Sequence, residues 1–324
     1  MQAIDVLSLA LVALIGFTVQ RASLCNVRAV AELIDSGSAG VLASLAKAVA
    51  WSAMVAGTLL LGFGMTPSAP LARSPFALAL LGGLAFGAGA ALNGGCSLST
   101  LQRLADGELS MLITLAGFLL GVASWTAVEV RQTATMLSPV ATPWMRMSSV
   151  SALILAALWL WAAFELVKLW RTRRRRPWGE MMLAPTYSLS AAAAILGVAG
   201  GVLYAVRGSW TYTNFLRTQI ASALGRPGPM MWPALLLVAL LGGMILSALQ
   251  RRSFALRAPS GSAAARHAAA GWLMGVGAAL LPGGNDTLLL SSLPALSLQA
   301  GGAYVALLAG IGCSLVVMRY VRRP

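Results

Sequence analysis

The chain has 324 residues, of which 58% are hydrophobic and only 10% are charged. Soluble globular domains carry about 25% charged residues, so the composition excludes that class and predicts an all-α polytopic membrane protein. A net charge of +14 would suggest nucleic-acid binding in a soluble chain, but the basic residues lie in short loops between apolar segments, and we expect no nucleic-acid partner. Three cysteines without a CxxC pair and a single histidine, His267, supply neither a zinc site nor a disulfide framework, and we expect no metal or other cofactor.

Apolar windows of the length needed to cross a bilayer, about 20 residues, occur nine times along the chain. They lie near residues 4–20, 41–63, 76–93, 110–130, 149–169, 188–206, 231–250, 268–282 and 300–318. The first window lacks the basic flank and the cleavage site of a signal peptide, so we expect it to be a span. The first, third and eighth windows are short and end in Gly-rich or polar turns, which predicts short re-entrant half-helices.

The distribution of basic residues predicts the orientation, because cytoplasmic loops of membrane proteins are enriched in Lys and Arg. Such residues gather after the fifth window (Lys168, Arg171, Arg173, Arg174, Arg175, Arg176), after the seventh (Arg251, Arg252, Arg257, Arg266) and in the tail (Arg319, Arg322, Arg323). With nine alternating spans, these three segments share the cytoplasmic side when the N-terminus is outside. The C-terminus is then cytoplasmic.

Two stretches of the chain repeat each other at a distance of 188 residues, namely Gly83 to Thr100 and Gly271 to Thr287. A weaker pair, Gln20 to Asn26 and Val206 to Asn214, sets Arg21 over Arg207, Ser23 over Ser209 and Cys25 over Thr211. Repeats of this kind are typical of transporters. The alternative is a chance coincidence of small residues, which is the more serious objection for the shorter pair.

An odd number of spans between two copies makes them enter the membrane from opposite sides. We therefore expect a first repeat over residues 1–130, a connector with the fifth span over 131–187, and an inverted second repeat over 188–324. The turns near residues 20–35 and 93–108 would then lie in the cytoplasmic half, and those near 207–220 and 282–298 in the outer half. Their tips would meet near the midplane.

The turn after the third window has the chemistry of an anion site. Gly94 and Gly95 expose backbone amides, Cys96 offers a thiol, and hydroxyls follow at Ser97, Ser99 and Thr100. Such a site binds an anion without a fixed countercharge, which suits a permeant that must also leave. The alternative is that the glycines serve helix packing and Cys96 is a small buried hydrophobe.

The turn after the first window presents a second thiol, Cys25, beside Asn26, with Arg21 or Arg28 available to attract anions. A buried cysteine next to arginines that extend to the membrane surface is equally compatible with this turn alone. Cys313 lies inside the last apolar window, where we expect core packing. In the second copy, Ser209 and Thr211 occupy the corresponding turn.

The bend after the eighth window carries Gly284, Asn285 and Asp286. A carboxylate at membrane depth is a candidate functional group, but we favour Asp286 as a cap of the half-helix that follows it. The remaining carboxylates are expected to be interfacial or solvated, with no convincing basic partner: Asp106, Glu108, Glu129 and Glu165.

Three segments, RASLCNVRAV, FGAGAALNGGCSLSTLQRLADGELS and GGNDTLLLSSLPALS, resemble the signature turns of the YeeE/YedE family, which includes the TsuA-type thiosulfate transporters. The resemblance implies a bacterial inner-membrane protein with an hourglass pathway, in which cysteines contact thiosulfate and pass it inward. Cys25 and Cys96 match two family cysteines. The third place is held by Asn285, or by Gly284 when the repeats are aligned without a gap, which puts thiosulfate specificity in doubt and leaves selenium compounds as an alternative.

We therefore expect uptake of thiosulfate or a related sulfur-containing anion, with no enzymatic activity. The resemblance also implies a cytoplasmic partner, a TusA-like or rhodanese-like sulfur carrier. One competing hypothesis is a membrane sulfurtransfer or redox protein that uses Cys25 and Cys96 as nucleophiles. Another is a docking subunit that binds the carrier through the basic run 171–176, although such runs more often determine topology.

Overall fold

The computed structural model describes residues 3–65, 71–72, 75–131, 138–139, 142–173, 184–225, 232–259, 261–281 and 283–321. These residues are almost entirely helical, and eight helices, or nine when one bent pair counts as a span, are long and apolar enough to cross a membrane. The predicted class is confirmed. The one described strand pairing is small, with Leu71–Ala72 (β1) antiparallel to Ser138–Pro139 (β2).

Each predicted window corresponds to a helix. In chain order these helices are α1 (Ala3–Ala22), α3 (Gly40–Gly57, continued by the π-helical η1, Thr58–Gly62), α4 (Phe76–Asn93), α6 (Ser110–Arg131), α7 (Ser149–Arg173), α9 (Leu189–Arg207), α11 (Trp232–Gln250), α12 (Gly261–Leu280) and α14 (Leu298–Val321). The eighth begins seven residues before its predicted start at 268, because the Ala-rich segment before His267 favours a helix although it carries Arg266.

Short helices follow four of these spans. They are α2 (Asn26–Ser36), α5 (Ser97–Ala105), α10 (Tyr212–Ala223) and α13 (Asn285–Thr287), which continues as η3 (Leu288–Ser292). The half-helices expected after the first, third and eighth windows are therefore present. The sixth span is interrupted as well, because Gly208 at the end of α9 has a left-handed φ of 68° that ends the helix.

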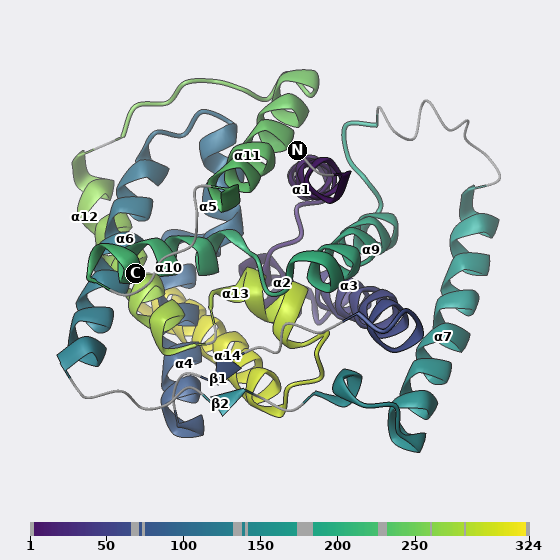
Figure 1. Cartoon of the computed structure of the whole chain (residues 1–324). Coiled ribbons are helices and arrows are strands. Elements are labelled where there is room, and N and C mark those ends of the chain that lie inside the picture. Colours follow the sequence, from purple (N-terminus) through teal and green to yellow (C-terminus); the bar gives the residue numbers. More distant parts are fainter. Residues whose placement is uncertain are drawn as a thin grey trace.

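Each helix of the first half has a counterpart in the second half, and helix pairs in contact remain in contact when each helix is replaced by its counterpart. Helix α1 packs against α11, as its counterpart α9 packs against α3, and α4 packs against α14 as α12 packs against α6. In the contacting pairs α4–α12 and α1–α9, the two helices are each other's counterparts. Figure 1 shows the resulting arrangement, with α4, α6, α12 and α14 on one side of the centre and α1, α3 and α9 on the other. The helix contacts made by one half of the chain therefore match those made by the other half.

Glycine contacts give the same relation at the level of atoms. A Cβ added at Gly89 in α4 would lie 2.7 Å from the carbonyl oxygen of Ala270, and one added at Gly277 in α12 would lie 2.7 Å from that of Gly82. Gly89 and Gly277 are 188 positions apart in the chain, and so are Gly82 and Ala270. Small residues allow this close approach of α4 and α12, as in other membrane helix interfaces.

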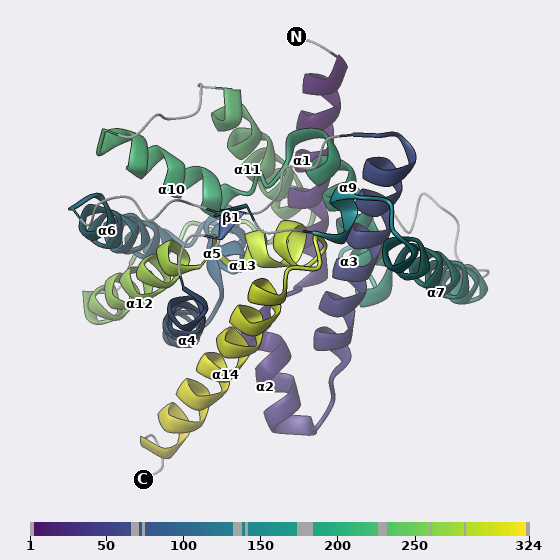
Figure 2. The same cartoon turned by 60° about the horizontal axis from the view of Figure 1, so that its bottom comes forward.

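The connector helix α7 lies at the periphery beside α3 (Figure 1). Much of its surface is exposed and apolar, as at Leu153, Leu160 and Phe164, which is typical of a lipid-facing helix. Figure 2 shows that the start of α1 and the end of α14 lie at opposite ends of the molecule.

Candidate functional site

The four half-helices begin at residues with related backbone conformations. Cys96, the N-cap of α5, has φ −71° and ψ 178°, and Gly284, the N-cap of α13, has φ −73° and ψ −172°. Cys25 before α2 and Thr211 before α10 are both extended, with φ −136° and −145°. The backbone therefore places Gly284, and not Asn285, at the position of Cys96, and Thr211 at that of Cys25.

The two cysteines of the first half are neighbours. Cys25 Sγ lies 3.8 Å from Cys96 Sγ, and Cys96 Sγ lies 3.5 Å from Ser99 Oγ. Both thiols are buried and free. The turns after the first and third spans, which are 71 residues apart in the chain, thus form a single thiol cluster, defined here as Cys25, Cys96 and Ser99.

A cavity of about 360 Å³ reaches the thiol cluster. Cys25, Ser99 and Gly94 line it together with three arginines, Arg28, Arg103 and Arg251, and one carboxylate, Asp106. Arg103 is paired with Glu108 at 2.6 Å, and Arg251 donates to the carbonyl oxygen of Gln20. The cavity, called the basic vestibule below, is suited to concentrate small anions beside the thiols.

Arg21, expected at the mouth of the path, is not in the basic vestibule. It is buried at the end of α1, where its guanidinium donates to Ser247 Oγ at 3.1 Å, to Gln250 Oε1 at 2.6 Å and to the carbonyl oxygen of Ala184 at 2.6 Å. The chain turns at Ser23, whose φ of 51° is left-handed, so Arg28 in α2 points to the vestibule instead. Arg21 therefore joins α1 to α11.

The second half carries oxygen atoms where the first half carries sulfur. Thr211 Oγ1 lies 2.5 Å from Thr287 Oγ1, which lies 3.2 Å from Thr213 Oγ1. Thr213 donates to Asp286 through its hydroxyl and, at 3.2 Å, through its amide. Asp286 thus caps the start of α10, and it also bonds to backbone amides of its own short helix, where a cap was expected. Ser209 lies just before this oxygen cluster, and its carbonyl accepts a bond from Asn214 Nδ2 at 3.0 Å.

The two clusters meet at one contact between half-helices. Ser97 Oγ, on the first residue of α5, donates to Asn285 Oδ1, on the first residue of α13, over 2.5 Å. Both side chains are 2% exposed. Asn26, next to Cys25, accepts a bond from the Tyr304 hydroxyl at 2.9 Å, while its own Nδ2 has no hydrogen-bond partner among the described residues.

The Gly-Gly turn is held by residues that the sequence patterns did not single out. Asn93 Nδ2 donates to the carbonyl oxygen of Gly95 and to Thr100 Oγ1, while Asn93 Oδ1 lies 3.0 Å from His267 Nδ1. Gly94 has a φ of 75° and ends α4. An Asn at the end of an apolar helix was the available signal for this role. For Thr213, the available signal was a second threonine two residues after Thr211.

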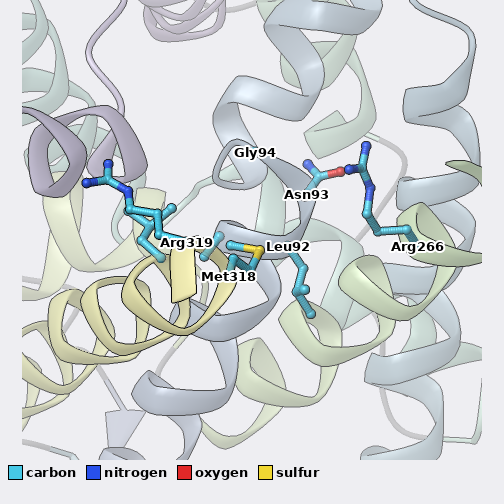
Figure 3. A pocket seen from close by; sticks show the side chains of 8 residues that line it. Leu92, Asn93, Gly94, Arg266, Met318 and Arg319 are labelled. Atoms are coloured by element: carbon cyan, nitrogen blue, oxygen red, sulfur yellow. The ribbon is translucent and has the colours of Figure 1, made fainter. Parts of the chain in front are cut away.

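A second cavity of about 270 Å³ lies next to the first and shares Gly94 with it. Figure 3 shows Arg319 of α14 and Arg266 of α12 on opposite sides of the end of α4, with Leu92 and Met318 between them. No cysteine lines it. The thiol cluster is therefore reached from the basic vestibule and not from this side.

Expectations about three further residues, Cys313, Glu165 and Glu108, are wrong. Cys313 is exposed on α14 and does not pack in the core. Glu165 is 3% exposed and forms an ion pair with Lys47, although it was expected at the interface without a basic partner. Glu108 pairs with Arg103 and Arg257, and Asp106 accepts a bond from Ser253 Oγ. The side chain of Glu129 lies outside the described part of the chain.

This arrangement, a helical membrane protein in which four short helices begin around one buried polar centre, is typical of a class of membrane transporters. The Sulphur transport family matches residues 21–313. The chain belongs to this family, which is also known as YeeE/YedE. No curated protein matches the chain.

Proposed function

We propose that this protein takes up thiosulfate, or a closely related sulfur-containing anion, across the bacterial inner membrane. The observation that carries the proposal is the thiol pair at the starts of two half-helices, in which Cys25 lines the basic vestibule and Cys96 lies directly behind it, 3.8 Å away. Thiols donate weak hydrogen bonds that suit a sulfur-containing anion, and helix starts carry partial positive charge. Neither interaction holds the anion permanently, so it can move on.

The side of the membrane on which each cluster lies follows from the orientation that we propose, with the N-terminus outside and the C-terminus cytoplasmic. Residues 1–130 and 188–324 then form the inverted repeats, and residues 131–187 form the connector. The basic vestibule lies beside Arg251, which belongs to a predicted cytoplasmic loop. The thiol cluster therefore belongs to the inner half of the path and the oxygen cluster to the outer half.

Transport is tested with purified protein in liposomes and sulfur-labelled thiosulfate. Cys96→Ala removes a donor to a charged ligand, which is worth about 1.5–3 kcal/mol, and uptake should fall by about tenfold or more. Cys313→Ala is the matched control, because that thiol is exposed on α14 and distant from the pathway in the chain. Uptake that Cys96→Ala leaves intact would contradict the role of the thiol cluster.

The permeant is identified in the same system by competition. A path with thiols in one half only should accept thiosulfate in preference to sulfate, which lacks the outer sulfur atom. Unlabelled selenium oxyanions are the third competitor. Equal competition by sulfate and thiosulfate would contradict a role of sulfur in recognition.

The alternative sulfurtransfer function makes a different prediction from the same two thiols. A nucleophilic cysteine would cleave thiosulfate in detergent solution, without any membrane. We propose that no such step occurs and that sulfite is not released. The proposed cytoplasmic partner, a TusA-like or rhodanese-like carrier, would then receive the anion after transport; Arg174, Arg175 and Arg176 of the proposed docking run lie outside the described residues.

A further inference from the structure

The oxygen cluster contains a buried carboxylate without a countercharge. Asp286 is 2% exposed, and among the described residues no Lys, Arg or His forms an ion pair with it. Helix α10 faces it with Thr213 and Tyr212, and the nearest basic residue on that helix, Arg217, is bonded to Asn214. On α5, Arg103 is paired with Glu108. An isolated carboxylate at membrane depth is costly and points to a function.

The hydroxyl groups around Asp286 form a chain with one direction. A threonine hydroxyl has one hydrogen, and that of Thr213 is donated to Asp286. The bond between Thr213 and Thr287 must therefore use the hydrogen of Thr287, and the bond between Thr287 and Thr211 must use that of Thr211. Three hydrogens in sequence thus point from Thr211 towards the carboxylate.

We propose that Asp286 is the proton-binding site that couples anion uptake to proton entry. A proton arriving at Thr211 moves each hydroxyl hydrogen one place along the chain, leaves every hydroxyl neutral and protonates Asp286. The oxygens of the three threonines lie 2.5 and 3.2 Å apart, which is hydrogen-bond distance, so the chain is continuous from Thr211 to Asp286.

Coupling to the anion follows from the position of Asp286 beside Asn285. The bond between Asn285 and Ser97 is the contact that joins the oxygen cluster to the thiol half of the path. An anion at this contact is repelled by an ionised Asp286 and not by a protonated one. By linkage, anion binding favours protonation and protonation favours anion binding. A proton carried inward also offsets part of the membrane potential that opposes anion entry.

This inference rests on the proposed function, and the experiment separates the two. Liposomes containing the full chain and a trapped pH indicator receive labelled thiosulfate at clamped membrane potential. An inward proton gradient should accelerate uptake by about fivefold or more, within the usual range of coupling between sites, and the lumen should acidify as the anion enters. Asp286→Asn keeps an oxygen that can accept from Thr213 but cannot titrate, so the response of uptake to the proton gradient should be lost.

A second pair of variants tests the hydroxyl chain without altering the carboxylate. Thr287→Val removes the hydroxyl, interrupts the chain and should slow acidification of the lumen. Thr287→Ser keeps the hydroxyl and should acidify the lumen as fast as the wild type. Asp35→Asn, at an exposed ion pair with Arg319, is the matched carboxylate control. Uptake without acidification, a response to sodium in place of protons, or an Asp286→Asn variant that keeps the response would each overturn the inference alone. Absence of thiosulfate uptake by the wild type would overturn the proposed function itself.

Discussion

Ser97 Oγ donates a hydrogen bond to Asn285 Oδ1 over 2.5 Å, and these two residues hold the same place in the two halves, 188 positions apart. Each is the first residue of its half-helix, after the N-caps Cys96 and Gly284. The matching short helices of the two halves therefore meet through corresponding residues. The bond joins a half that carries thiols to a half that carries hydroxyls and a carboxylate, so the two halves differ in chemistry although their N-cap conformations match.

The Ser97 to Asn285 bond should be measurable as a coupling energy. Ser97→Ala leaves a buried acceptor on Asn285 without its partner, which costs about 1–3 kcal/mol. The same range holds for Asn285→Ala. Because both changes remove one bond, the double variant should lose less than the sum of the single losses, by about 0.5–3 kcal/mol.

Thermal unfolding in detergent of the wild type, the two single variants and the double variant gives this cycle. Ser36→Ala, at an exposed serine bonded to the carbonyl of Glu32, is the control and should change little. Strictly additive losses would show that the bond contributes nothing to holding the two half-helices together.

The positions of the spans could be predicted from the sequence because each depends on a local property. A run of apolar residues gives the helix, and a glycine with left-handed φ, such as Gly94, gives its end. The repeat predicted that Cys25 corresponds to Thr211, and the matching extended N-caps agree with it. The repeat alone left open whether Gly284 or Asn285 corresponds to Cys96. The N-caps place Gly284 there, because the start of each short helix determines the register.

Cys25 and Cys96 should form a disulfide on mild oxidation. Their sulfur atoms are 3.8 Å apart, and a disulfide needs about 2.05 Å, so small side-chain rotations suffice. Oxidation with copper phenanthroline in a Cys313→Ala background should remove both alkylation sites, as counted by mass spectrometry, and dithiothreitol should restore them. In the Cys25→Ser variant, Cys96 should stay reactive. Two cysteines that remain alkylatable after oxidation would contradict the observed proximity.

The basic vestibule should raise the local anion concentration through Arg28. Arg28→Gln removes an exposed charge, worth up to about 1 kcal/mol, so the half-saturating thiosulfate concentration for efflux from the vestibule side should rise by up to about fivefold. High salt should reduce this difference, because exposed charges are screened.

The matched control is Arg266→Gln, which removes the same charge from the neighbouring cavity that contains no thiol. It should leave the efflux constant unchanged. Equal effects of the two substitutions would mean that overall charge, and not the vestibule, sets the local anion concentration.

Contacts between segments that are far apart in the chain could not be predicted from the sequence. Arg21 and Arg28 are seven positions apart and equally basic, and only the left-handed turn at Ser23 sends one into the helix packing and the other into the vestibule. The link from His267 through Asn93 to the Gly-Gly turn joins α12 to α4, 174 positions apart, and no local pattern marks it. The carboxylate of Asp286 also bonds to α10, in a different part of the chain.

The ion pair of Lys47 and Glu165 should be a main attachment of the connector helix α7 to the first repeat. Glu165 is 3% exposed and Lys47 also donates to Ser190 Oγ at 2.9 Å, so the pair joins α7, α3 and α9. Removal of one partner of a buried pair costs about 3–5 kcal/mol, and because Lys47 is 22% exposed we expect Glu165→Leu to lie near 3 kcal/mol. Replacement of both partners, Lys47→Met with Glu165→Leu, should recover most of this loss, because no charge is then left unpaired in an apolar setting.

The exposed pair of Asp35 and Arg319 is the control, since Asp35→Asn should cost less than about 1 kcal/mol. Thermal unfolding in detergent measures all three variants, and a Glu165→Leu protein as stable as the wild type would show that α7 is held by its apolar contacts alone.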